Sequence, residues 1–130
     1  MYKKSKIIHI LAALLLAVAM LLAFTACRRE DSIIGRWELT TWEQIFEDEH
    51  SIDDHSGILE FLSDGTGSFV SEHFLLEFEW ETDGDQLVMI EFGFREYHTF
   101  NISGDTLTLT FNEYFGDFVV TVIETYIRLG

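Results

Sequence analysis

Most of the chain alternates between apolar and polar residues with a period of two, which is the pattern of half-buried β-strands. Between residues 74 and 81 one face carries Phe, Leu, Phe and Trp, while three glutamates lie on the other face. Between 106 and 111 leucine and phenylalanine alternate with threonine in the same way. The pattern predicts strands at 36–46, 57–63, 67–72, 74–82, 86–92, 94–102, 106–112 and 118–128.

Short turn signals built from glycine and aspartate separate these segments, since both residues tolerate the backbone angles of tight turns. They fall at Asp64-Gly65, Asp83-Gly84-Asp85, Gly104-Asp105 and Gly116-Asp117. Eight antiparallel strands joined by short hairpins can close into a barrel, which leaves no exposed sheet edge. We therefore predict an all-β domain over 33–130, a small up-and-down antiparallel barrel of about eight strands.

The N-terminal segment has a different pattern. Lys3, Lys4 and Lys6 precede an almost unbroken apolar run over 7–24, which is the order of a secretory signal. An uncleaved transmembrane anchor is the alternative, because about 18 apolar residues can just span a bilayer. Both interpretations place the following domain outside the cytoplasm, since the lysines stay on the inner side.

The residues around Cys27, the single cysteine, are similar to a known processing site. The run Ala23-Phe24-Thr25-Ala26-Cys27 resembles the lipobox of bacterial lipoproteins, with Phe24 at the position usually held by leucine. The resemblance implies a signal peptide over 1–26, diacylglycerol on the Cys27 sulfur and a lipidated tether over 27–32. Two or three acyl chains anchor a protein stably. We expect attachment to the outer face of the cytoplasmic membrane, or to the outer membrane if the source is Gram-negative.

The mature domain resembles a second family. Ile34-Gly35-Arg36-Trp37 resembles the G-x-W opening of lipocalin-like domains. In lipocalins this tryptophan closes one barrel end beneath an arginine from the last strand, so the resemblance implies that Trp37 and Arg128 form that pair. Further motifs are similar to the small lipocalin-like domains of bacterial lipoproteins: Leu59, Phe61, Asp64-Gly65-Thr66-Gly67, Phe100, Ile102, Gly104-Asp105, Leu107 and Leu109.

The lipocalin-like fold implies an interior that either binds a ligand or fills itself. Aromatic side chains are expected to line it: Phe61, Phe69, Phe74, Phe78, Trp80, Phe92 and Phe100. We expect non-enzymatic binding of a small apolar ligand or an envelope component. The alternative is a filled barrel that acts as a protein-interaction or inhibitor module through its acidic surface. A cavity of several hundred Å3 would favour the ligand.

The charge of the mature chain narrows the choice of partners. From Cys27 onward five arginines stand against 23 acidic side chains, which leaves a formal charge of −18. Bulk electrostatics therefore argue against binding a nucleic acid or an anionic membrane surface. No nucleic-acid partner is expected, and the domain is predicted to be a monomer.

The same charge predicts that stability depends on salt. Repulsion among the carboxylates should be screened as sodium chloride is added, because the Debye length falls from about 30 Å at 0.01 M to about 3 Å at 1 M. We expect the melting temperature to rise over this range. A melting temperature that stays flat from low to high salt would contradict the prediction.

The segment 47–55 contains five carboxylates and two imidazoles, and we predict it to be a loop after the first strand. Carboxylate and imidazole together can bind divalent ions. The weak candidates are Glu49, His50, Asp53 and His55. Because the segment lacks the residue order of a calcium loop and the spacing of a zinc enzyme, a solvated acidic loop is preferred. No cofactor is expected, and no catalytic residue, since no serine lies in a G-x-S-x-G motif.

Overall fold

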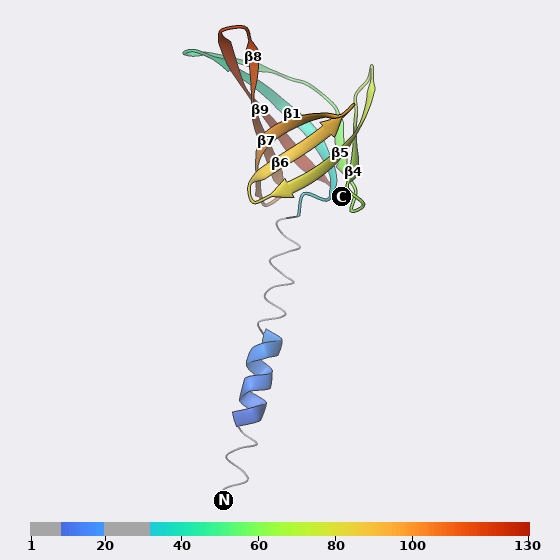
Figure 1. Cartoon of the computed structure of the whole chain (residues 1–130), viewed down its shortest axis with the longest axis vertical. Helices are drawn as coiled ribbons and strands as arrows, with labels where there is room; N and C mark the ends of the chain where they lie inside the picture. Colours follow the sequence, from blue (N-terminus) through green and yellow to red (C-terminus); the bar gives the residue numbers. More distant parts are fainter. Residues whose placement is uncertain (1–8, 20–31) are drawn as a thin grey trace, which may run out of the picture. The chain divides into compact units, whose positions relative to one another are not determined.

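The computed structural model describes residues 9–19 and 32–130 (Figure 1). Its contacts divide the chain into two units, Met1–Ser32 and Ile33–Gly130, and all the strands lie in the second. Residues 9–19 are helical. Within the described part of the chain no helix has the length and apolarity needed to cross a membrane. Cys27 lies outside the described residues, so its lipid attachment stays a prediction.

The second unit is a closed antiparallel barrel. β1 pairs with β9 along most of its length and with β3 at its N-terminal end, which joins the first and last strands and closes an eight-stranded sheet. This architecture confirms the predicted all-β barrel and is compatible with a calycin-like fold. The strands are β1 (Gly35–Phe46), β2 (Glu49–Asp53), β3 (Ile58–Phe61), β4 (Thr66–Val70), β5 (Leu75–Asp83), β6 (Gln86–Glu91), β7 (Phe94–Ser103), β8 (Thr106–Phe115) and β9 (Phe118–Leu129).

The described part of the chain has one strand in addition to the eight of the barrel, and this strand is β2. It lies in the acidic segment that we predicted to be a loop, so that prediction was wrong. β2 pairs back on the second half of β1, from Trp42↔Asp53 to Phe46↔Glu49. All five of its residues are exposed. Because neither face of β2 is buried, its sequence lacks the period-two apolar pattern by which the other strands were predicted.

The connections between the strands alternate between the two ends of the barrel. The turns after β3, β5 and β7 lie at one end, which we call the closed end, and the turns after β4, β6 and β8 lie at the other, which we call the open end. Figure 1 shows the β8–β9 and β1–β2 hairpins projecting from the open end. The Asp-Gly and Gly-Asp turns at 64–65, 83–85 and 104–105 all belong to the closed end.

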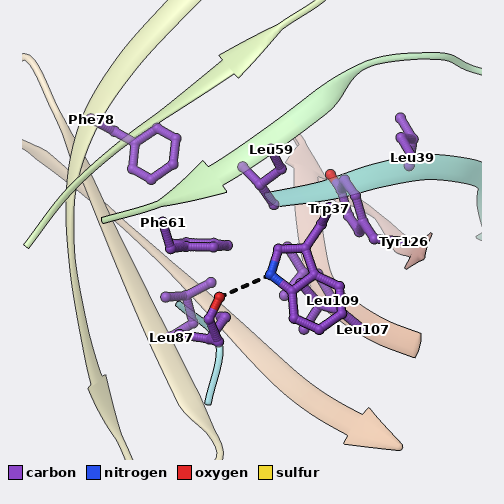
Figure 2. Packing of buried hydrophobic residues seen from close by; sticks show 10 residues of the cluster. Trp37, Leu39, Leu59, Phe61, Phe78, Leu87, Leu107, Leu109 and Tyr126 are labelled. Atoms are coloured by element: carbon purple, nitrogen blue, oxygen red, sulfur yellow. Dashed lines mark hydrogen bonds between the residues drawn. The ribbon is translucent and has the colours of Figure 1, made fainter. Parts of the chain in front are cut away.

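The hydrophobic core fills the closed half of the barrel. Trp37 is fully buried at its centre, and its indole Nε1 donates a hydrogen bond to the Ile33 carbonyl at 2.8 Å. Figure 2 shows Phe61, Leu87 and the neighbouring side chains packed into one cluster around it. The other buried members are Ile33, Leu39, Leu59, Phe78, Leu107, Leu109 and Tyr126.

The pair implied by the lipocalin resemblance is present at the closed end. The guanidinium carbon of Arg128 lies 4.1 Å from the centre of the Trp37 ring, and the two residues are directly opposite each other in the β1–β9 ladder. Gly35 has a φ of 132°, and a Cβ added there would lie 3.4 Å from Arg128 Nη1. Glycine at the first position of G-x-W therefore provides an unusual backbone angle close to the arginine.

A β-bulge in β1 changes which side chains point inward. The register with β9 shifts between Leu39 and Thr41, so Leu39 opposes Tyr126 and Trp42 opposes Glu124. An extra residue in one strand reverses the alternation after it. Trp42 consequently faces the same side of the sheet as Trp37, which the unbroken alternation of the sequence does not indicate.

Candidate ligand site at the open end of the barrel

Five of the seven predicted interior aromatics pack in or against the core. Phe61 and Phe78 are buried, and their rings meet edge to face at 5.7 Å. Trp80 packs edge-on against Phe61 at 5.3 Å and donates from Nε1 to the carbonyl oxygens of Leu62 and Thr66. The partly buried Phe69 and Phe100 lie against the same cluster. These side chains fill the closed half with core packing.

The prediction was wrong for Phe74 and Phe92, which lie on the surface. Phe74 is 56% exposed in the connection before β5, and Phe92 is 90% exposed in the turn after β6. Phe92 has a φ of 50°, a left-handed turn conformation that ends the strand alternation one residue before the sequence pattern suggests. Both side chains therefore project from the open end.

The predicted metal candidates are not brought together. His50 Nδ1 lies 2.9 Å from Glu43 Oε1, on the face of β2 opposite Glu49 and Asp53. The His55 ring packs edge-on against Trp42 at 4.9 Å. Among the residues that the structure describes, no three His, Cys, Asp or Glu side chains are arranged to hold a metal ion.

A cleft forms at the open end where β7 and β8 separate. The two strands pair only from Thr99↔Thr110 to Ser103↔Thr106, and 94–98 and 111–115 are not paired with each other. The gap has a volume of about 680 Å3. We call it the His98 cleft, and it is lined by Gln86, Arg95, Glu96, Tyr97, His98, Thr99, Thr110, Phe111, Asn112, Glu113 and Tyr114.

A second cleft of about 970 Å3 opens where β5 and β6 separate. The last pair between these strands is Glu79↔Ile90, so the beginning of β5 stands away from the end of β6. Exposed apolar residues such as Leu62, Leu75 and Phe92 contribute to its wall. The barrel is thus closed by core packing at one end and opens between hairpins at the other.

His98 is the most unusual side chain in the first cleft. Its side chain is only 5% exposed, and neither ring nitrogen has a hydrogen-bond partner among the described residues. Nε2 lies 3.7 Å from Glu96 Oε2, and the ring packs edge-on against Phe111 at 4.7 Å. Burial lowers the pKa of His98 to about 4, so the imidazole is neutral at pH 7 and presents one donor and one acceptor.

A carboxyl group on β9 lies in the same region. Glu124 accepts a hydrogen bond from the Tyr126 hydroxyl and opposes Trp42 across the sheet. Burial raises the pKa of Glu124, and the charges of Glu113 and Glu96 raise it further, against the lowering effect of the Tyr126 hydrogen bond. The acidic side chains of β7, β8 and β9 therefore act on one another across the open end.

Sequence reasoning missed Glu96, Glu113 and Glu124 as members of a site, although the alternation contains a signal for them. The inward positions of β8 run Leu107, Leu109, Phe111, Glu113 and Phe115, and those of β9 include Val122, Glu124 and Tyr126. One carboxylate interrupts each apolar series. His98 occupies such a position in β7, between Glu96 and Phe100. A polar residue at an inward position in each of three successive strands indicates a shared polar region.

Comparison with known proteins identified no relative of this chain. No family model matches the chain, and no curated protein and no solved structure matches it.

Proposed function

We propose that the protein is a membrane-anchored extracytoplasmic lipoprotein with a lipocalin-like domain that binds a small molecule at the open end of its barrel, without catalysis. The observation that carries this proposal is His98, a buried imidazole with no hydrogen-bond partner among the described residues, in the wall of a cleft of about 680 Å3. Ligand sites usually have volumes of about 300–1,000 Å3 and few polar groups. The cleft falls within that volume range, although most of its lining residues are polar.

The cost of leaving a buried polar group unpaired supports the assignment. A buried donor or acceptor without a partner costs about 1–3 kcal/mol, so such groups occur where a ligand or water completes them. A ligand that bonds to His98 would recover this cost on binding. The core packing of the closed half supports the open end as the binding region, in place of the aromatic interior expected from the sequence.

Binding is preferred to catalysis because of how His98 is held. A catalytic histidine normally contacts a nucleophile and is oriented by a third group. Here the ring lies against Phe111, and the nearest carboxylate, Glu96, is 3.7 Å away on an exposed side chain. Burial also keeps the imidazole neutral and lowers its basicity. These features suit recognition better than proton transfer near pH 7.

Native mass spectrometry of the full chain tests the binding proposal. Protein purified gently in a non-ionic maltoside should carry a noncovalent adduct with the mass of a small organic molecule. The adduct should disappear on denaturation and in Thr110→Trp, which fills the His98 cleft from β8. A bare mass both after purification and after incubation with a small-molecule library would overturn the proposal.

The anchor is tested separately, by denaturing mass spectrometry of the protein from bacterial membranes. Processing at the lipobox predicts loss of residues 1–26 and a diacylglycerol-sized addition on the peptide that begins with Cys27. Cys27→Ser should abolish both changes. An unprocessed chain with a free Cys27 thiol would favour the transmembrane anchor instead.

A protein-interaction function is the second candidate, and one observation favours it. The β4–β5, β6–β7 and β8–β9 connections at the open end expose large apolar side chains, among them a set that we call the aromatic rim: Phe74, Leu75, Phe92, Phe94, Phe115 and Phe118. Large exposed apolar patches often mark interaction surfaces. If this function is correct, Phe92→Ser with Phe118→Ser should remove a specific cross-link to an envelope protein and leave the small-molecule adduct unchanged.

A further inference from the structure

The His98 cleft contains negative charge that no arginine of the described chain balances directly. Glu96 and Glu113 line it, and both raise the pKa of Glu124 through their charges. Two carboxylates in the lining and a third on β9 thus concentrate negative charge in this region. A potential of this sign attracts cations and repels anions.

The arginines of the barrel are engaged elsewhere. Arg36 pairs with Glu60 at 3.5 Å, and Arg128 lies over the Trp37 ring at the closed end. Arg95 lines the cleft, but its Nη1 lies 3.0 Å from Glu81 Oε1. The sequence has no lysine after Lys6. Within the described barrel the arginine contacts thus go to groups other than Glu96 and Glu113, which leaves these two carboxylates available to a cationic ligand.

A second and independent observation points to a ligand at this position. His98 is more than nine-tenths buried, lines the cleft and has both ring nitrogens without a hydrogen-bond partner among the described residues. Both ring nitrogens have almost no exposed surface, and the one that carries the lone pair of a neutral imidazole is an acceptor that no described residue satisfies. Phe111 lies edge-on to His98, and Tyr97 and Tyr114, which follow Glu96 and Glu113 in the chain, are also lining residues. Aromatic faces attract cations.

We propose that the His98 cleft binds a small organic cation, in which an ammonium group faces Glu96 and Glu113 and donates to His98, while an attached apolar group packs against Phe111. The inference rests on the proposed binding function and specifies its ligand class. An organic cation fits better than a metal ion, because in 9–19 and 32–130 no set of three suitable side chains is arranged as metal ligands. The exposed, polar edge of the cleft also suits a ligand with one charged end.

Three probes that share a phenylethyl group and differ in charge test this inference by isothermal titration calorimetry on the full chain in a non-ionic maltoside. The probes are 2-phenylethylammonium, the neutral 2-phenylethanol and the anionic 3-phenylpropanoate. We expect the ammonium to bind at least about tenfold more tightly than the alcohol, and the carboxylate to bind most weakly, since each of the two carboxylates contributes about a fivefold change in affinity.

Two charge-removing variants locate the site, and a third is the matched control. Glu113→Gln and Glu96→Gln should each weaken binding of the ammonium by about fivefold and leave binding of the alcohol nearly unchanged. Glu38→Gln removes the same charge from β1, outside the cleft lining, and should change the affinity by less than about twofold, because it makes no contact with the ligand and salt screens its longer-range effect. Using two cleft variants keeps the test informative if one fails to fold.

The outcomes separate this inference from the proposed function. The proposal of a cation site is wrong if 2-phenylethanol binds as tightly as the ammonium, or if neither cleft variant weakens binding of the ammonium. Either result leaves the proposal of small-molecule binding intact. A native adduct that proves to be neutral or anionic has the same consequence. If no probe binds and native mass spectrometry shows only the bare chain, the proposed function itself fails.

Discussion

Replacing Trp37 by alanine should lower the free energy of unfolding by about 3–5 kcal/mol, the usual cost of truncating a fully buried aromatic side chain. The indole is fully buried at the centre of the closed half, donates to the Ile33 carbonyl and lies beneath Arg128. The substitution removes all three interactions and leaves a cavity. Small domains are stable by about 5–15 kcal/mol, so much of the total would be lost. Urea unfolding of the full chain in a non-ionic maltoside measures this change in the free energy of unfolding.

Phe92→Ala is the matched control for this prediction. It also truncates an aromatic side chain, but Phe92 is 90% exposed at the open end, so the expected change lies within about 0.5 kcal/mol. The contrast separates the filled closed half from the aromatic rim. Equal losses in Trp37→Ala and Phe92→Ala would contradict the assignment of the core.

Removing the His98 imidazole should flatten the response of stability to acid. The folded-state pKa of about 4 lies below the ordinary value of 6.5, so the unfolded chain binds more protons between these two values. The stability associated with His98 is therefore complete above about pH 6.5 and is lost as the pH falls toward 4, by about 3 kcal/mol in total. His98→Phe should lack this loss. Urea unfolding at pH 7, 6, 5 and 4.5 would show it.

The neighbouring carboxyl groups make comparison with the wild type necessary. Glu96 faces His98 directly, and Glu124, whose pKa is raised, contributes in the opposite direction as the pH falls. Both carboxyl groups are present in the wild type and in the variant, so their contributions to the free energy of unfolding largely cancel when the two proteins are compared. His98→Leu serves as a second variant without an aromatic ring. A difference between wild type and both variants that does not change from pH 7 to 4.5 would show that His98 is not buried in its neutral form.

The fold was largely predictable because alternation and turn chemistry agreed along the chain. Asp-Gly and Gly-Asp turns separated the strands correctly, and the G-x-W resemblance identified the contact between Trp37 and Arg128. The two failures have local causes. β2 is exposed on both faces, so neither face requires apolar residues, and its sequence lacks the period-two pattern of a half-buried strand. The bulge after Leu39 reverses the alternation without any glycine or proline that would indicate it.

The candidate site was predictable only in part, because it depends on where paired strands separate. Strict alternation predicted that Phe74 and Phe92 point inward like Phe61 and Phe78. Strand pairing does not extend to Phe74 or Phe92, however, and both side chains lie on the surface. No sequence signal shows that β7 and β8 pair over only half their length. The inward carboxylates can be recognised in the sequence as charged residues at apolar positions, but only after the strands have been aligned with one another.

One NMR titration tests most directly whether a ligand enters the open end. The chain has five histidines and three tryptophans, so ring-labelled protein in a non-ionic maltoside gives few signals, and single substitutions assign them. On addition of 2-phenylethylammonium, the His98 ring signals should shift and saturate, while the indole signals of Trp37 and Trp80 in the closed half stay unchanged. Shifts at Trp37 or Trp80 with His98 unmoved would place binding in the closed half and contradict the account.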